Sequence, residues 1–270
     1  MPFLASRNQI FYYEDTGGEL PVVVFSHGFL SDHELFAPQV HALRYRFRCI
    51  TWDQRYHGQT STDNCPFTIE DSVEDLHSLL EHLAIERAAL VGFSFGAWVS
   101  NRFALAYPDQ VAALVIIDSY ERMESEEERS NYLGFKAMMT SQGFDEELSS
   151  LLLGFLFGAD FDASHWVAKW RFRPPQQWAH VYDAMLSRND ICDQLKEIRC
   201  PSIVLHSECN PANPPEVSAQ LCRSLGSCQR MVVIEGSGHT APLEKPDQVN
   251  IELIDFLNQN FQPLKLGSDE

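Results

Sequence analysis

The residues with the clearest chemical potential lie in a G-x-S-x-G segment, residues 92–96, centred on Ser94. An apolar run expected to form a strand, 88–93, leads into it, and a segment expected to form a helix, 95–107, follows. A sharp strand-to-helix turn strains the backbone, and the flanking glycines leave room for such a turn. The turn would hold the hydroxyl above the edge of a sheet, so Ser94 is predicted to be a nucleophile.

A serine hydroxyl needs a base to take its proton, and the best candidate in this sequence is His239. This histidine ends the segment Gly-Ser-Gly-His, residues 236–239, which follows the last expected strand. An imidazole in a glycine-rich loop at the end of a strand could reach a serine at the same sheet edge. We therefore predict that His239 activates Ser94.

A third segment could stabilise the negative charge that forms on a substrate oxygen. His27 and Gly28 follow another expected strand, and the glycine would let this loop approach the nucleophile. The backbone N–H groups of Phe29 and Phe95 are predicted to form an oxyanion hole. His27 is expected to brace the loop by hydrogen bonds rather than to act as a base.

The elements that must position these residues alternate between short β-branched runs and longer amphipathic stretches, the pattern of a doubly wound, mostly parallel α/β sheet. Expected strands are 22–26, 49–52, 88–93, 112–117, 203–206 and 231–234, and expected helices are 35–43, 69–83, 95–107, 216–225 and 248–261. The rhythm breaks within 120–195, which contains helical, Trp-bearing segments without a strand pattern. We expect an α/β core formed by 1–119 and 196–270, with 120–195 inserted as a helical cap.

Four segments together resemble the α/β-hydrolase superfamily: the His27-Gly28 loop, Trp-Asp-Gln-Arg-Tyr-His-Gly at 52–58, the serine segment at 92–96 and the histidine segment at 236–239. The resemblance spans 10–118 and 200–262, and is strongest to esterases, lactonases and C–C-bond hydrolases. It implies a serine hydrolase that works through an acyl-enzyme and needs no cofactor or metal.

The acidic residue that orients the histidine departs from the family pattern. An Asp is usual after the penultimate strand, but Asn210 stands at that position. A neutral amide can hold an imidazole but cannot stabilise an imidazolium by its charge. In some relatives the acid follows the strand next to the nucleophile strand, where this chain has Asp118. Asp118 is favoured as the orienting acid, and Asn210 stays open as the orienting residue.

Aromatic side chains near these segments predict an apolar pocket for a hydrophobic small-molecule substrate. The predicted substrate contacts are Leu30, Phe93, Trp98, Trp166 and Trp170. Three other functions stay open because fold does not settle chemistry: a cofactor-independent dioxygenase of a hydroxylated heteroaromatic, a non-hydrolytic lyase or cyclase, and a ligand-binding member of the fold.

Composition argues against several classes of partner. The formal net charge of −18 disfavours nucleic acid and anionic membrane surfaces. Because no long apolar run and no signal-peptide pattern are visible, a cytoplasmic location is expected. The seven scattered cysteines are expected to be reduced, and homodimer formation is left open.

Overall fold

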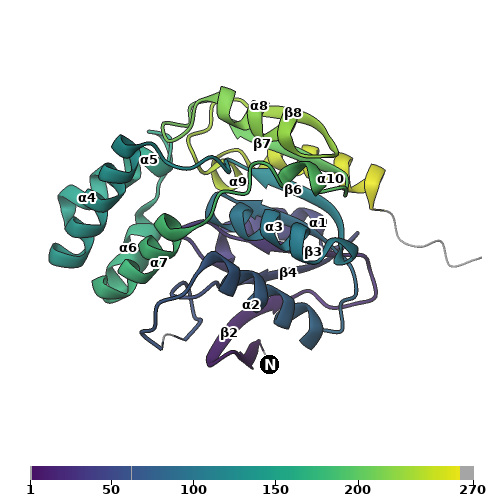
Figure 1. Ribbon diagram of the computed structural model, residues 1–270, viewed down its shortest axis with the longest axis horizontal. Helices are drawn as coiled ribbons and strands as arrows, with labels where there is room; N and C mark the ends of the chain where they lie inside the picture. The colour runs from purple at the N-terminus through teal and green to yellow at the C-terminus, as the bar shows by residue number, and fades with distance from the viewer. Residues whose placement is uncertain (1, 62, 262–270) are drawn as a thin grey trace, which may run out of the picture.

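The computed structural model describes residues 2–61 and 63–261, whose strands form one eight-stranded sheet in the order β1-β2-β4-β3-β5-β6-β7-β8 (Figure 1). β1 pairs antiparallel with β2, and β2 with β4, whereas all later pairs are parallel. The strands are β1 Phe3–Ser6, β2 Gln9–Asp15, β3 Val22–Ser26, β4 Arg48–Trp52, β5 Ala88–Phe93, β6 Val111–Ile117, β7 Ser202–Ser207 and β8 Cys228–Ile234.

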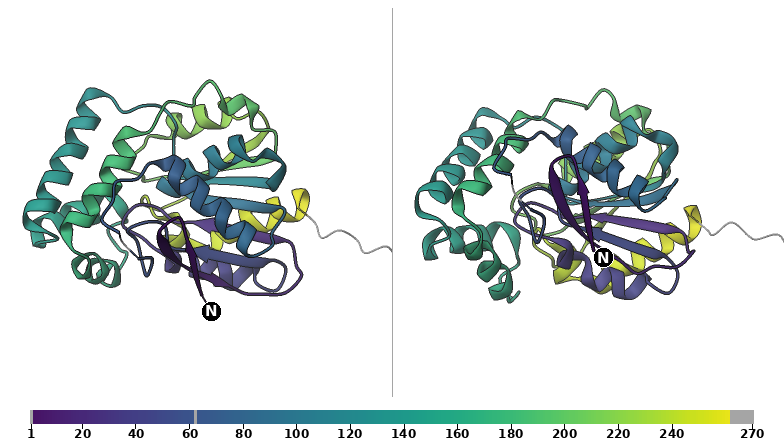
Figure 2. Two further views of the ribbon diagram at one scale, coloured as in Figure 1. Left: turned by 60° about the horizontal axis from the view of Figure 1, so that its bottom comes forward. Right: turned by 90° about the horizontal axis from the view of Figure 1, so that it is seen from below.

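Helices cover both faces of the sheet. α1 packs against α10 on one face, and α2 packs against α3 on the other, as the two views of Figure 2 show. The core helices are α1 Ala37–Leu43, α2 Ile69–His82, α3 Phe95–Ala106, α8 Pro215–Ser224, α9 Ala241–Glu244 and α10 Pro246–Asn260, with 3-10 turns at His33–Phe36, Pro108–Gln110 and Leu195–Glu197. The expected doubly wound, mostly parallel architecture is confirmed.

Burial explains which strands the sequence predicts well. Every residue of β3, β5, β6 and β7 is buried, because helices cover both faces of these central strands. Their continuous apolar runs are therefore easy to recognise. The sequence pattern does not predict β1 and β2, which form the antiparallel edge of the sheet, where buried and exposed residues alternate.

Between β6 and β7 the chain forms four helices that lie together beyond the carboxyl edge of the sheet (Figures 1 and 2). They are α4 Glu126–Gln142, α5 Glu146–Leu156, α6 Ser164–Phe172 and α7 Pro175–Ser187, all within the predicted cap.

Two buried arginines hold the ends of this cap in place: one joins both ends to the core, and the other joins the ends to each other. Arg102 of α3 pairs with Glu121 at 2.9 Å and donates a hydrogen bond to the carbonyl of Asn189 at 2.7 Å. Arg188, at the end of α7, pairs with Glu124, and both side chains are almost completely buried. Removing one partner of a buried ion pair costs about 3–5 kcal/mol, so these pairs hold the cap firmly where it joins the sheet.

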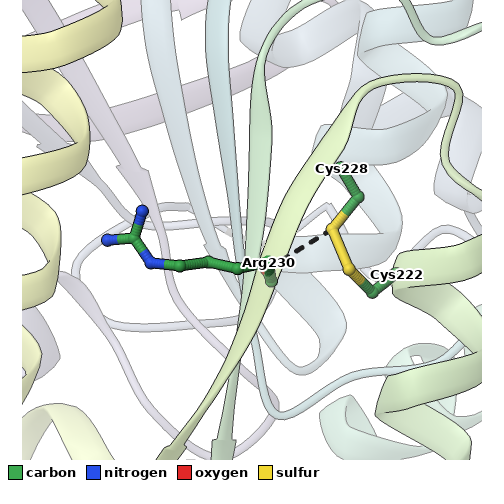
Figure 3. Close-up of a disulfide and its surroundings, with 3 residues drawn as sticks. All are labelled: Cys222, Cys228 and Arg230. Carbon is green, nitrogen blue, oxygen red and sulfur yellow. Dashed lines mark hydrogen bonds between the residues drawn. A yellow bond between two sulfur atoms is a disulfide. The ribbon is translucent and has the colours of Figure 1, made fainter.

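The expectation that all cysteines are reduced is wrong. Cys222 at the end of α8 and Cys228 at the start of β8 form a disulfide (Figure 3). The short connection between the two elements brings their Cα atoms to 5.4 Å, within the range that a disulfide spans. Because tertiary geometry brings this pair together, cysteine spacing alone gives no signal for it.

None of the described helices is long and apolar enough to cross a membrane.

Candidate active site

Ser94 lies at the junction of β5 and α3 in a strained backbone conformation, with φ 50° and ψ −114°. Its own N–H donates to the carbonyl of Ile117 at 2.9 Å, which fixes the turn to the neighbouring strand. A Cβ at Gly96 would lie 2.0 Å from the carbonyl oxygen of Ser26, and one at Gly92 would lie 2.6 Å from the Cα of Ala97. Both flanking glycines are therefore required by close backbone contacts, as expected for a sharp strand-to-helix turn.

His239 lies in the loop after β8, and it lines the same cavity as Ser94. The carboxylate of Glu244 shapes this loop by accepting hydrogen bonds from the backbone N–H groups of Gly238 at 2.9 Å and Thr240 at 3.1 Å. Burial, with a smaller contribution from His206 nearby, lowers the pKa of the His239 imidazole to about 4. The ring is therefore neutral at pH 7 and can accept a proton, but its imidazolium form needs a compensating charge.

Asp118 follows β6 with φ 48°, and its carboxylate is almost completely buried. It accepts hydrogen bonds from the backbone N–H of Ser207 at 2.8 Å, the hydroxyl of Ser207 at 2.5 Å and the side-chain amide of Asn210 at 3.0 Å. Burial raises the pKa of this carboxyl to about 7, while the three hydrogen bonds oppose the rise. The two candidates for the orienting role thus touch each other, and Asn210 directs its amide to Asp118.

In this structure neither candidate makes a hydrogen bond to the His239 ring. Among the described residues, the Nδ1 atom of His239 is buried and has no hydrogen-bond partner. The amide oxygen of Asn210 accepts from the backbone N–H of Ala212 at 2.9 Å, so both ends of this side chain are engaged elsewhere. Asp118 retains accepting capacity, because a carboxylate offers about four lone-pair positions and three donors occupy it.

A second buried histidine, His206, belongs to this cluster, and no motif in the sequence marks it. The Nδ1 atom of His206 lies 2.9 Å from the hydroxyl of Ser218 and 3.7 Å from Asp118 Oδ1. Burial lowers the pKa of His206. Its position on β7, next to the strand that carries Asp118, becomes apparent only once the strand order is known.

The two backbone amides predicted to form an oxyanion hole have no hydrogen-bond acceptor among the described residues. The N–H groups of Phe29 and Phe95 donate no hydrogen bond to any residue that the structure describes. Phe29 lines the cavity that contains Ser94, and Phe95 begins α3 directly after that serine. His27 braces the loop, because its Nε2 accepts from the backbone N–H of Gln54 at 3.0 Å and its Nδ1 lies 2.7 Å from the Gly28 carbonyl oxygen.

The cavity at Ser94 and His239 has a volume of about 340 Å³ and lies between the sheet edge and the cap. Of the five predicted substrate contacts, Leu30 lines it, and the other four lie outside its lining. Trp98 instead donates to the Tyr120 carbonyl at 2.5 Å and lies beneath the guanidinium of Arg188. Phe93 packs beside the His239 ring with a centroid distance of 5.0 Å.

The remaining two predicted contacts, Trp166 and Trp170 of α6, line a different cavity on the outer side of the loop that contains Leu30. The cavity at Ser94 is lined instead by side chains of α4, α5 and α7: Tyr132, Phe135, Leu152, Tyr182 and Met185. The sequence shows apolar residues at helical spacing in these segments, but that pattern does not say which helix covers the serine.

Comparison with known proteins relates this architecture to a family. A model of the alpha/beta hydrolase fold matches residues 21–246. The chain belongs to the α/β hydrolase fold family. Over 263 residues it is 27% identical to the putative carbamate hydrolase RutD of Caulobacter sp. (strain K31), a match that covers 92% of this chain and 95% of that protein.

Solved structures of other α/β hydrolases are similar across nearly the whole chain. A thermophilic esterase from Thermogutta terrifontis is 27% identical with a TM-score of 0.84, covering 96% of this chain and 97% of that one. The enol-lactonase from Burkholderia xenovorans LB400 is 23% identical with a TM-score of 0.87, covering 95% of this chain and 100% of that one. At 23% identity, the similarity to the enol-lactonase shows a shared fold alone.

Within the described part of this α/β hydrolase, one group of residues has the spacing of a metal site. Ligand atoms of Asp32, His33 and Asp53 lie within 4.8 Å of one another. Asp53 already accepts from the His33 ring at 2.8 Å, from the His33 backbone N–H at 2.7 Å and from Gln59 at 2.7 Å. This carboxylate therefore has a structural role in joining two loops.

Proposed function

We propose that this α/β hydrolase cleaves a hydrophobic ester or lactone, or an activated C–C bond, through an acyl-enzyme on Ser94. The observation that carries the proposal is a serine held on a strained turn and lining one cavity with a neutral histidine. A structure stores about 1–3 kcal/mol of backbone strain at such a residue, and that cost is typical of functional sites.

In the proposed mechanism, His239 takes the proton of Ser94 as the hydroxyl oxygen attacks the substrate carbonyl carbon. The oxyanion that forms accepts hydrogen bonds from the N–H groups of Phe29 and Phe95. The histidine then protonates the leaving oxygen, and water, with His239 again as base, releases the acyl group. For a C–C bond the leaving carbon would take the proton instead.

Asp118 is proposed to stabilise the imidazolium. The Nδ1 atom of His239 is left without a partner, and catalytic hydrogen bonds are often long or absent until substrate binds. Asn210 and Ser207 would hold the carboxylate in place while it accepts the Nδ1 proton in a hydrogen bond. Asn210 then has a supporting role, as a donor to the acid.

The cavity walls support an apolar acyl group. Phe135, Leu152 and Met185 provide apolar surface, and the rings of Tyr132 and Tyr182 add aromatic surface with hydroxyl groups. The named relatives act on an ester, an enol-lactone or, putatively, a carbamate, all of which present an electrophilic carbonyl. We propose an ester or a lactone as the substrate of this protein. Aryl carbamates assayed beside esters and lactones test whether it acts on carbamates instead.

The test is covalent labelling with a small fluorophosphonate, read as intact mass. One adduct is expected on the unmodified protein and none on Ser94→Ala. Ser141→Ala is the matched control, because Ser141 is an exposed serine of α4 whose loss should leave labelling unchanged. Full labelling of Ser94→Ala would contradict the assignment, and a labelled protein would then be assayed on aryl esters, lactones and carbamates.

One observation favours a second candidate, a cofactor-independent dioxygenase of a hydroxylated heteroaromatic. Its acid would also be the one that follows β6, and His239 would deprotonate the substrate instead of the serine. Oxygen uptake with a hydroxyquinoline substrate that persists in Ser94→Ala would support it. Binding of ligands without turnover of any kind would instead favour a ligand-binding member of the fold.

A further inference from the structure

A second cavity, of about 430 Å³ and called the outer cavity here, borders the loop of residues 30–34, which follows the predicted oxyanion-hole residue Phe29. Its walls come from residues 30–34, residues 58–59, α6 and the start of α7, and it does not include Ser94 or His239. Leu30 is the residue that lines both this outer cavity and the cavity of the serine. The proposed mechanism makes no use of this space.

Aromatic side chains form much of the wall of the outer cavity. Trp166 and Trp170 of α6 and Trp178 of α7 are all buried and line it. Phe172, at the end of α6, also lines it and is 92% exposed. A phenylalanine so exposed contributes little to the core, and at a cavity mouth it offers a flat surface to a ring.

A cation without a carboxylate partner also lines the outer cavity. Arg173 donates to the Gly58 carbonyl at 2.5 Å and to Gln177, but it makes no salt bridge with any carboxylate in 2–61 or 63–261. The acids nearby have closer cations of their own: Asp32 binds the ammonium of Lys169 at 2.6 Å. Because no described carboxylate pairs with it, the guanidinium of Arg173 is available to an anion.

A guanidinium without an anionic partner, in a cavity with aromatic walls, favours a ligand that is flat and negatively charged.

We propose that the outer cavity binds a planar aromatic carboxylate. Its ring would lie among Trp166, Trp170 and Phe172, and its carboxylate would accept hydrogen bonds from the guanidinium of Arg173. This site is independent of the proposed hydrolytic activity, because none of the residues that bind the ligand takes part in the chemistry at Ser94.

The experiment is isothermal titration calorimetry of the full chain with 2-naphthoate as the probe and 2-naphthamide as its neutral isostere. One molecule of 2-naphthoate is expected to bind, with the amide at least tenfold weaker, because the amide cannot form a charge-assisted pair with a guanidinium. Arg173→Gln is expected to weaken naphthoate binding by about ten- to hundredfold and to leave the amide nearly unchanged.

Arg171→Gln is the matched control, because this exposed neighbour on α6 lies outside the cavity lining, and naphthoate affinity should not change. Phe172→Ala, at an exposed position that is safe for folding, should weaken both ligands severalfold through lost ring contact. Equal affinity for naphthoate and its amide, or unchanged naphthoate binding in Arg173→Gln and Phe172→Ala, would overturn the proposal. Either result would mean that any bound naphthoate lies at another site, such as the cavity of Ser94.

Discussion

Replacement of Asp118 by asparagine tests how this protein could stabilise an imidazolium with an amide at the usual position of the acid. Asn is isosteric, and its side-chain oxygen can still accept from the backbone N–H of Ser207 and from Asn210. Its NH₂ group would face the Ser207 hydroxyl, which can accept in turn. The fold should therefore persist while the buried negative charge is lost.

The magnitude follows from the burial of the pair. Two unit charges about 4 Å apart at an effective dielectric constant near 20 attract by about 4 kcal/mol. If most of this energy is present in the transition state, Asp118→Asn should lower the turnover number by about 10²- to 10³-fold. The Michaelis constant should change little, because Asp118 does not line the cavity at Ser94.

The dependence on pH gives a second readout. Burial raises the pKa of Asp118 to about 7 and lowers that of His239 to about 4. Activity needs an ionised acid and a neutral base, so it should rise with pH through about 7, following the acid. In Asp118→Asn this limb should move toward the lower pKa of the histidine.

The assay is steady-state hydrolysis of a nitrophenyl ester between pH 5 and 9, with the rate of fluorophosphonate labelling as a substrate-independent check. Asn210→Asp is the companion variant, since it would add a second carboxylate about 3.0 Å from the first. The paired exchange Asp118→Asn with Asn210→Asp keeps one carboxylate and one amide in contact.

Full activity of Asp118→Asn at every pH would refute the reasoning. Higher activity of Asn210→Asp than of the unmodified protein would assign the acid to the usual family position instead.

Three further predictions concern structure around the site. Gly96→Ala should abolish soluble folded protein or lower the melting temperature by more than 10 °C, because its Cβ would lie 2.0 Å from a backbone oxygen; an unchanged melt would contradict this. Glu244→Gln should reduce turnover about tenfold, because the Glu244 carboxylate braces both the His239 loop and the cap at Gly158. Asp247→Asn, at an exposed position, is the control, and equal kinetics of the two variants would exclude this role. The double variant Cys222→Ser, Cys228→Ser should lower the free energy of unfolding in urea by about 2 kcal/mol, because the disulfide closes a loop of sequence separation 6. An unchanged free energy of unfolding would mean that the disulfide does not stabilise the fold.

Local patterns in the sequence predict much of the core of this protein. Continuous β-branched runs mark the central strands because those strands are buried on both faces. Thr68 begins α2 with a reciprocal capping box to Asp71, which is a signal within four residues of chain. Glycines at 92 and 96 predict the strained turn at Ser94 because that constraint is also local.

Tertiary structure alone decided which distant residues meet. Asp118 and Asn210 are 92 positions apart and share a hydrogen bond because β6 and β7 are parallel neighbours whose carboxyl ends coincide. No spacing rule could show that the amide binds the acid, or that the acid leaves the His239 ring without a partner.

The cap shows the same limit. Its sequence indicates helices, but Trp166 and Trp170 line the outer cavity, whereas residues of α4, α5 and α7 cover the serine. Helical periodicity determines which face of a helix is apolar, because it depends on residues three and four positions apart. Which surface that face then covers depends on how helices pack against each other and the sheet, and that is a property of the whole folded chain.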